Sequence, residues 1–322
     1  MDRMVRLTAP GGTNMLTIVD CPVGDPGPGQ IRIRQAAIGL NFIDIYHRRG
    51  QYPLAANAVI GVEAAGMVEA LGEGVDTLSV GDRIAYAGEI GAYAATRLLP
   101  AWRAVRLPDS VSFEAAAGAL LRALTVHMLF RRVYPVSAES TVLVHAAAGG
   151  LGGMATRWAR HLGATVIGVV GSEDKAEIAR RHGALHVIIG RDADLESEVA
   201  ALTCGNGVDF AIDGIGGATL AKTLKTVKRF GVVASVGEAA GSIPPVSVYE
   251  LGPRRSISLA RPSVMAYAAH ERDYTTAAED CLQMIGSGAL GTDPARYRLE
   301  DVSRAHDDLE GGVLQGSAVL IA

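Results

Sequence analysis

The stretch 141–155 has residue types and a spacing that suit the binding of a phosphate group. Residues 141–144 have the pattern of a buried strand, a run of small residues follows at 146–153, and a helical pattern covers 154–162. With Ala147 in place of the first glycine, the spacing Ala-x-Gly-x-x-Gly between a strand and a helix is typical of a dinucleotide-binding turn. Side chains are nearly absent because the backbone must approach a pyrophosphate. We expect the diphosphate to be held by Ala147, Ala148, Gly149, Gly150, Leu151 and Gly152; the alternative is a tight turn that binds no ligand.

The residues after the next strand indicate which nicotinamide coenzyme the turn would accept. NAD-selective domains carry an acid about 20 residues past the turn, where it binds the ribose 2′-hydroxyl. Here that position falls at Gly171-Ser172 and Lys175 follows, and a hydroxyl with an ammonium suits a 2′-phosphate. We therefore expect NADPH, unless Ser172 only caps a helix and Lys175 is only a solvated charge. The strand ends at Gly214 and Val236 should face the coenzyme as well.

The pattern of expected strands and helices changes along the chain, and it indicates which elements position these residues. Before residue 110, short alternating strands separated by turns, such as 30–35, 59–68 and 93–98, indicate a β-rich, barrel-like domain. From 141 to 236, strands alternate with helices, which predicts a doubly wound parallel sheet. The expected helices include 120–132 and 264–285, and 317–321 should form a terminal strand. We predict one domain from residues 1–119 and 259–322, with an α/β cofactor domain, 120–258, inserted between them.

Composition limits the class of protein. The 322 residues are 49% hydrophobic and 20% charged, which favours a large buried core over disorder. The net charge is −4 without a long basic run, so nucleic acid is not an expected partner. The first twenty residues contain no apolar signal core, and no segment has the length and hydrophobicity of a membrane span, so a cytoplasmic protein is expected. Cys21, Cys204 and Cys281 lie too far apart in sequence to suggest a disulfide motif.

Several blocks resemble the zeta-crystallin type of quinone oxidoreductase, within the medium-chain dehydrogenase/reductase superfamily. They are Gly39-Leu-Asn-Phe-Ile-Asp-Ile-Tyr46, Leu124-Thr-Val126, His145-Ala-Ala-Ala-Gly-Gly-Leu-Gly152, Arg261-Pro-Ser263 and, more weakly, Gln315-Gly-Ser317. The resemblance implies a Rossmann domain inserted into a GroES-like catalytic domain, and a homodimer. It implies NADPH bound through the Ser172 and Lys175 positions. Arg191 would stand in for a family tyrosine that is Gly190 here.

The same resemblance places further residues at the coenzyme. Asn41, Asp44, Tyr46 and Tyr52 would lie near the nicotinamide, and Thr125 and Ser317 would also contact the coenzyme. Asn41 could hold the carboxamide or the ribose, and Tyr46 or Tyr52 could donate a hydrogen bond to the acceptor oxygen. For the tyrosines, ordinary packing is the alternative. For Thr125, the alternative is a hydrogen bond back to the carbonyl four residues earlier in its helix.

A metal is not expected. The zinc-dependent relatives place a Cys at or beside the position of Asn41, and a Gly-His-Glu where this chain has Gly61-Val62-Glu63. Zinc needs three or four converging ligands, and the Cys and His are both replaced. His182 and His186 are four residues apart, but Gly183 between them should end the helix, so they would not share a helical face.

These features predict an NADPH-dependent quinone reductase that transfers hydride without a metal to a conjugated acceptor. An enone or 2-enoyl thioester reductase on the same scaffold is an alternative, for which Arg254 and Arg255 could bind a carrier phosphate. A non-catalytic NADPH-binding or RNA-binding protein is a third possibility. The net negative charge of the chain speaks against RNA binding.

Overall fold

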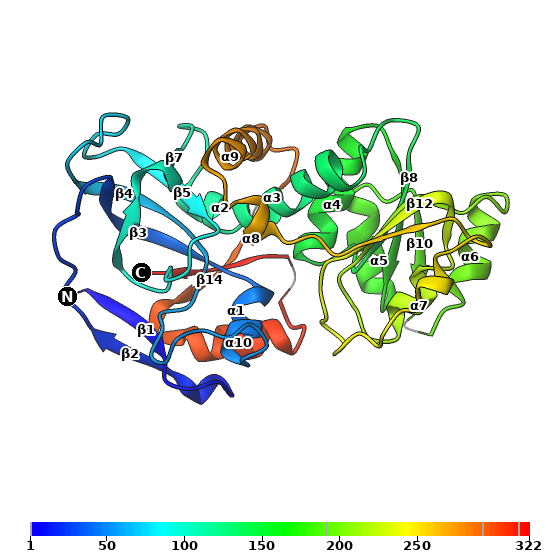
Figure 1. The fold of residues 1–322 in the computed structure, drawn as a ribbon, viewed down its shortest axis with the longest axis horizontal. Helices are drawn as coiled ribbons and strands as arrows, with labels where there is room; N and C mark the ends of the chain where they lie inside the picture. Colours follow the sequence, from blue (N-terminus) through cyan, green and yellow to red (C-terminus); the bar gives the residue numbers. More distant parts are fainter. Residues whose placement is uncertain (1, 191, 292, 315) are drawn as a thin grey trace. The chain divides into compact units, whose positions relative to one another are not determined.

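The computed structural model describes residues 2–190, 192–291, 293–314 and 316–322, and the chain divides into two compact units (Figure 1). Unit 1 comprises residues 1–124 and 264–322, and unit 2 comprises residues 125–263. The sequence predicted that the cofactor domain ends at residue 258 and that the first domain resumes at residue 259. The structure differs because β13 (Ser258–Ala260) pairs in parallel with β12 (Val227–Ser235), which makes it the sixth strand of the sheet in unit 2.

Unit 2 contains the predicted doubly wound parallel sheet. Its strand order is β10-β9-β8-β11-β12-β13, and neighbouring strands pair in parallel. The remaining strands are β8 (Thr141–His145), β9 (Thr165–Val170), β10 (His186–Ile189) and β11 (Val208–Asp213). The chain runs outward from β8 to β10 and then returns to β11 on the other side of β8. A ligand crevice is expected at the carboxyl ends of β8 and β11, because this is where the direction of winding reverses.

Helices cover the two faces of this sheet, so its strands are nearly continuous apolar runs. Residues Val142, Leu143 and Val144 in β8 are all buried, as expected for a parallel strand covered on both sides. The helices of unit 2 are α4 (Gly150–His161), α5 (Glu173–Arg181), α6 (Leu195–Leu202) and α7 (Thr219–Thr223), with short turns at Leu129–Val133 and Val248–Glu250.

Unit 1 is built on a seven-stranded sheet that joins both ends of the chain. Its order is β14-β15-β3-β4-β5-β7, and β6 pairs with β3 off this path. These strands are β3 (Gln30–Leu40), β4 (Glu63–Leu71), β5 (Arg83–Ala87), β6 (Thr96–Pro100), β7 (Val105–Arg106), β14 (Ala295–Arg298) and β15 (Ala318–Ile321); β1 (Arg3–Leu7) and β2 (Leu16–Asp20) form a separate pair. The helices are α1 (Phe42–Arg48), α2 (Phe113–Ala117), α3 (Leu120–Met128, which crosses into unit 2), α8 (Val264–Tyr267), α9 (Glu271–Gly286) and α10 (Val302–Glu310).

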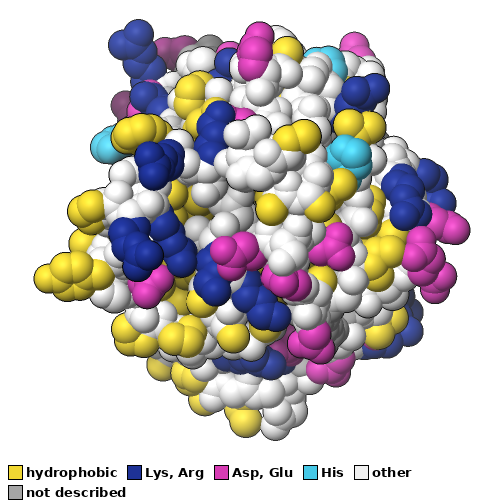
Figure 2. Space-filling model, turned by 90° about the vertical axis from the view of Figure 1, so that its right-hand side faces the viewer, with side chains coloured by type: hydrophobic (Ala, Val, Ile, Leu, Met, Phe, Trp, Pro, Cys, Tyr) yellow, Lys and Arg dark blue, Asp and Glu magenta, His cyan; other side chains and the backbone are white. Residues whose placement is uncertain are grey.

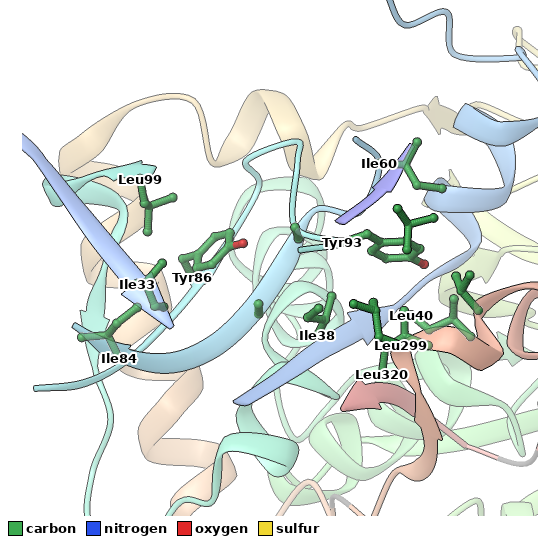
Figure 3. Packing of buried hydrophobic residues seen from close by; sticks show 14 of the residues in the cluster. Ile33, Ile38, Leu40, Ile60, Ile84, Tyr86, Tyr93, Leu99, Leu299 and Leu320 are labelled. Atoms are coloured by element: carbon green, nitrogen blue, oxygen red, sulfur yellow. The ribbon is translucent and has the colours of Figure 1, made fainter. Parts of the chain in front are cut away.

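The core of unit 1 contains aliphatic side chains and buried tyrosines. Tyr86 and Tyr93 are fully buried among residues such as Ile33, Ile60 and Leu299 (Figure 3). A buried tyrosine requires a hydrogen-bond partner for its hydroxyl group. Tyr86 donates to Gln35 Oε1 at 2.6 Å, and Tyr93 donates to Asp44 Oδ2 at 3.0 Å. The second bond connects the core to α1.

Several predicted elements have different bounds in the structure. The strand expected at 59–68 begins only at Glu63, because Gly61 has φ 87° and lies against the Tyr93 ring without room for a Cβ atom. The helix expected over 264–285 is two helices, since His270 is extended and the carbonyl of Ala268 accepts a hydrogen bond from Arg103. The helix expected over 120–132 is α-helical to Met128 and continues as a wider π-type turn.

Candidate active site

The glycine turn of unit 2 is closed by contacts that exclude side chains. The chain leaves β8 through Ala146, which has φ 49°, a left-handed conformation that alanine rarely adopts. A Cβ atom at Gly152 would collide with the carbonyl of Ala146 and lie 2.6 Å from that of His145. The last glycine of the predicted spacing is therefore required by backbone that cannot move aside.

The helix after the turn begins earlier than predicted. The sequence placed the first helical residue near Met154, whereas α4 begins at Gly150, with Gly149 as its N-cap. The first amides of an α-helix have no acceptor within the helix. Gly150, Leu151 and Gly152 therefore present N–H groups at the positive end of the helix dipole, and an anion is the favoured ligand there.

A buried polar network beside the turn was not predicted. His145 lies 2.9 Å from the hydroxyl of Thr223 through its Nε2, and that hydroxyl lies 3.0 Å from Asp213 Oδ2. Asp213 Oδ1 accepts the amides of Ile215 and Gly216 at 2.9 and 3.0 Å. This network joins the ends of β8 and β11 and shapes the turn that carries Gly214. The sequence signal was an Asp followed by Gly at a strand end, which favours an Asx turn.

The predicted residues Gly214 and Val236 follow neighbouring strands at this edge of the sheet. Asp213 pairs with Ser235 in the β11–β12 register, and the Val236 amide donates to the Asp213 carbonyl at 2.8 Å. Arg261, from the Arg-Pro-Ser block, bonds Ser235 at 2.9 Å and Glu238 at 2.6 Å. The block thus holds the segment after β12 in place.

The proposed 2′-phosphate residues lie at the exposed start of α5. Ser172 is the N-cap, and among the described residues its side chain makes no capping hydrogen bond. The choice between a capping role and a phosphate contact for Ser172 therefore stays a prediction. Glu173, which would repel a phosphate, pairs with Arg180 at 3.1 Å. Lys175 is exposed, and Arg191 lies outside the described residues.

A second cluster, in unit 1, surrounds the start of α1. Asn41 is the N-cap, and its backbone N–H donates to Asp44 Oδ2 at 2.9 Å, as in a capping box. The Asn41 side chain instead donates from Nδ2 to Glu63 Oε1 at 2.7 Å. Glu63 Oε2 accepts the Leu121 amide at 2.7 Å. Because a carboxylate only accepts hydrogen bonds, Glu63 fixes the Asn41 amide with its carbonyl oxygen turned away from Glu63.

Two buried carboxyl groups give this cluster its electrostatics. Desolvation by burial raises the pKa of Asp44 to about 7, against lowering by the hydrogen bonds from Asn41 and Tyr93. Burial also raises the pKa of Glu63 to about 7, and the nearby Arg122 opposes that rise. Among the described residues, Asp44 Oδ1 is buried without a hydrogen-bond partner. With both hydrogen bonds on Oδ2, the proton that the raised pKa retains lies on Oδ1.

The predicted tyrosines stand beside this cluster. Tyr46 lies on α1 and is partly buried, while Tyr52 is 43% exposed. Their ring centroids are 5.4 Å apart in an edge-to-face arrangement. Unit 1 therefore brings together Asn41, Asp44, Tyr46 and Tyr52. Ser317 also belongs to unit 1, where its carbonyl accepts the Ala295 amide at 2.8 Å, whereas Thr125 is the first residue of unit 2.

The side chains at the zinc-ligand positions do not suit a zinc ion. Val62 has no donor atom, Asn41 is bonded to Glu63, and both oxygens of Glu63 already accept hydrogen bonds. No group of three or more His, Cys, Asp or Glu side chains that could hold a metal occurs in the described part of the chain. We therefore assign no step to a metal.

Comparison with known proteins shows the family of the chain. Residues 27–109 match the alcohol dehydrogenase GroES-like domain, and residues 150–282 match the zinc-binding dehydrogenase family. A quinone oxidoreductase from Salmonella typhimurium is 39% identical over 316 residues, covering 97% of each chain. The chain belongs to the quinone oxidoreductase family. The predicted family and fold class, a Rossmann sheet with a GroES-like domain, are thereby confirmed.

Two further relatives of this quinone oxidoreductase family bear on chemistry. The crystal structure of Escherichia coli quinone oxidoreductase complexed with NADPH is 37% identical, covers 99% of this chain and all of that one (100%), and has a TM-score of 0.95. A 2-haloacrylate reductase from a Burkholderia species is 38% identical over 320 residues, covering 97% of this chain and 96% of the relative.

Proposed function

We propose that this protein is an NADPH-dependent quinone reductase that passes hydride to a quinone or a related conjugated acceptor. The observation that carries the proposal is the turn at Gly152, where backbone carbonyls leave no room for a Cβ atom and three helix amides are presented together. That site lies in a chain that matches quinone oxidoreductases along almost its whole length.

Unit 2 supplies the residues that would hold the coenzyme. The amides of Gly150, Leu151 and Gly152 suit the diphosphate, with Ala147, Ala148 and Gly149 shaping the approach. The Ser172 hydroxyl and the Lys175 ammonium, both at the start of α5, suit a 2′-phosphate. Gly214 and Val236 suit the adjacent part of the coenzyme, because they end the strands beside β8.

Unit 1 supplies the groups proposed for the reacting end. The bound coenzyme would supply hydride, so the protein needs to place the acceptor and exclude water. Asn41, held by Glu63, offers its carbonyl oxygen to a carboxamide or ribose donor. Tyr46 and Tyr52 offer hydroxyl groups to the acceptor oxygen. Asp44 is proposed to lie near the nicotinamide on the strength of the family resemblance, and it accepts the Asn41 amide. Thr125 and Ser317 remain proposed contacts on the strength of the family resemblance.

The test is a coenzyme-oxidation screen. The purified protein is assayed with NADPH against quinones, enones and crotonyl-CoA, and the panel is repeated with NADH and with a chelator. We expect quinone-dependent oxidation of NADPH that is faster than that of NADH and insensitive to the chelator. Absence of NADPH binding by calorimetry would refute the proposal outright.

An alkene reductase is the second candidate. The relative named 2-haloacrylate reductase is as similar to this chain as several quinone oxidoreductases are, and a haloacrylate is also an electron-poor conjugated acceptor. The screen should therefore include 2-chloroacrylate. A higher kcat/KM for 2-chloroacrylate or crotonyl-CoA than for every quinone would favour this candidate.

An RNA-binding role gains no support from the charges. On the face shown in Figure 2, Lys and Arg side chains are interspersed with Asp and Glu. The net charge is −4, and nucleic-acid affinity depends on concentrated positive charge. A gel-shift assay at physiological salt would expose such a role if it exists.

A homodimer and a cytoplasmic location complete the proposal. Unit 2 exposes Phe230, Val248 and Tyr249 at 83%, 79% and 94%, and β13 is the edge strand of its sheet. Exposed apolar groups and an open sheet edge each favour association with a second copy, which light scattering of wild-type and Tyr249→Ser protein would test. The three cysteines are free, as expected in a reducing compartment. Within the described residues, no helix is long and apolar enough to cross a membrane.

A further inference from the structure

His182 lies far from the glycine turn in sequence but contacts it directly. It is the C-cap of α5, and Gly183 after it has φ 102°, so the helix ends there as predicted. Its Nδ1 lies 3.0 Å from the carbonyl oxygen of Ala147. A carbonyl oxygen only accepts, so Nδ1 carries the proton and donates it. Burial lowers the pKa of His182, with Arg157 and Arg181 acting in the same direction.

The glycine pattern contains a residue that makes this contact possible. Gly153 follows the last glycine of the dinucleotide spacing, so the motif itself does not require it. A Cβ atom at Gly153 would lie 2.6 Å from His182 Nδ1 and 2.7 Å from Cε1. Glycine at this position leaves room for the imidazole ring against the first turn of α4.

The contact fixes the direction of one peptide group. In a trans peptide, the carbonyl and the following N–H point in opposite directions. With the Ala147 carbonyl turned toward His182, the Ala148 N–H points away from the histidine. That amide has no hydrogen-bond partner among the described residues. The turn therefore has one more free donor next to the helix amides of Gly150, Leu151 and Gly152.

We propose that His182 is a positioning residue for coenzyme binding. Its Nδ1–H donates a hydrogen bond to the Ala147 carbonyl, and this contact turns the Ala148 N–H toward the diphosphate. The inference rests on the proposed coenzyme site and adds a residue that the dinucleotide spacing does not include. Because the diphosphate is common to NADPH and NADH, His182 acts on the affinity for both coenzymes equally. Lys175 acts only on NADPH, which carries the 2′-phosphate.

Three substitutions separate this role from packing. Asn places an N–H donor on the same γ carbon as His Nδ1, Gln places one further out, and Leu has no donor. We expect His182→Leu and His182→Gln to raise the Kd of both NADPH and NADH about tenfold, the equivalent of one hydrogen bond to a charged group. His182→Asn should stay within about threefold of wild type. Lys175→Ala is the matched control, and it should weaken NADPH alone.

The measurement is coenzyme fluorescence titration of the full chain, with a thermal melt of each variant without ligand. Equal affinities in the Asn and Gln variants would overturn the inference, as would a loss confined to NADPH. If the Leu variant does not fold, the Asn and Gln pair still decides. Nitrogen NMR of wild type should show the His182 ring as the Nδ1–H tautomer, and the opposite tautomer would also overturn it. Wild-type protein that binds neither coenzyme would instead refute the proposed function.

Discussion

The buried Asp44 carboxyl makes a prediction about pH and stability that can be worked through in full. Its two hydrogen-bond donors, the Asn41 amide and the Tyr93 hydroxyl, both bond Oδ2, and Oδ1 has no partner among the described residues. The substitution Asp44→Asn can therefore keep an oxygen at the Oδ2 position and both hydrogen bonds. It replaces the titrating Oδ1 by an amide group that does not titrate.

The sign follows from the raised pKa. The folded protein keeps Asp44 protonated up to about pH 7, whereas the unfolded chain releases that proton near the ordinary pKa of 3.8. Between these two values the folded state binds more protons, so the free energy of unfolding of the wild type falls as pH rises. The shift of about 3 pKa units corresponds to about 4 kcal/mol. The Asn variant has no such group, and so it should gain about 4 kcal/mol over wild type between pH 4 and pH 8.

The assay is urea denaturation without coenzyme across that pH range. A Trp158→Phe background leaves Trp102, which lies in the same unit as Asp44, as the only tryptophan reporter. Glu63 titrates in both proteins and its charge contributes to the raised pKa of Asp44, so the difference reports Asp44 together with its coupling to Glu63. The half-exposed Asp82 is the control: its hydrogen bonds from Ser79 and Arg106 lower its pKa, so Asp82→Asn should lose relative stability as pH rises from 3 to 5. Parallel pH profiles for wild type and Asp44→Asn would refute the reasoning.

Four further results are expected. Gly152→Ala should cost about 1–3 kcal/mol of stability through overpacking and raise the KM for NADPH at least about tenfold, because its Cβ meets backbone carbonyls; an unchanged KM would remove the turn from the coenzyme site. Lys175→Ala should lose about 1.5–3 kcal/mol of NADPH binding without affecting NADH, and an unchanged NADPH/NADH ratio of kcat/KM would clear Lys175 of that role. Tyr52→Phe should lower quinone turnover if its hydroxyl bonds the acceptor, whereas unaltered turnover leaves it as a packing residue. Dialysis against a chelator should leave activity intact, and loss that zinc restores would contradict a metal-free site.

Local features of the site could be predicted from the sequence, and tertiary partners could not. The glycine turn and the Asn41–Asp44 capping contact follow from residues within a few positions of one another, where backbone sterics and capping preferences decide. The partners of these groups come from far along the chain. Glu63 reaches Asn41 across 22 residues, and His182 reaches Ala147 across 35. No periodicity or spacing encodes such pairs without the fold.

The predicted boundaries of helices and strands were wrong where tertiary contacts overrode local propensity. Ala146 carries no signal for a left-handed backbone, because alanine seldom adopts one. The strand expected from Val59 was shortened by Gly61 against Tyr93, a contact between segments about thirty residues apart. The apolar pattern over 264–285 is helical at both ends, yet nothing in it indicates the break around Ala268, whose carbonyl is taken by Arg103.

The topology of the seven-stranded sheet determines which unit can fold first during synthesis. Strand β3, made within the first forty residues, has β15 from the last five as a neighbour, with Leu40 opposite Ala318. His306 likewise reaches Tyr93 across 213 positions. By contrast, the Rossmann sheet is encoded in one uninterrupted segment and needs nothing from either terminus. On the ribosome, every strand of the unit 2 sheet is therefore made before β15 can complete the sheet of unit 1. Until then β3 keeps an open edge, which favours aggregation.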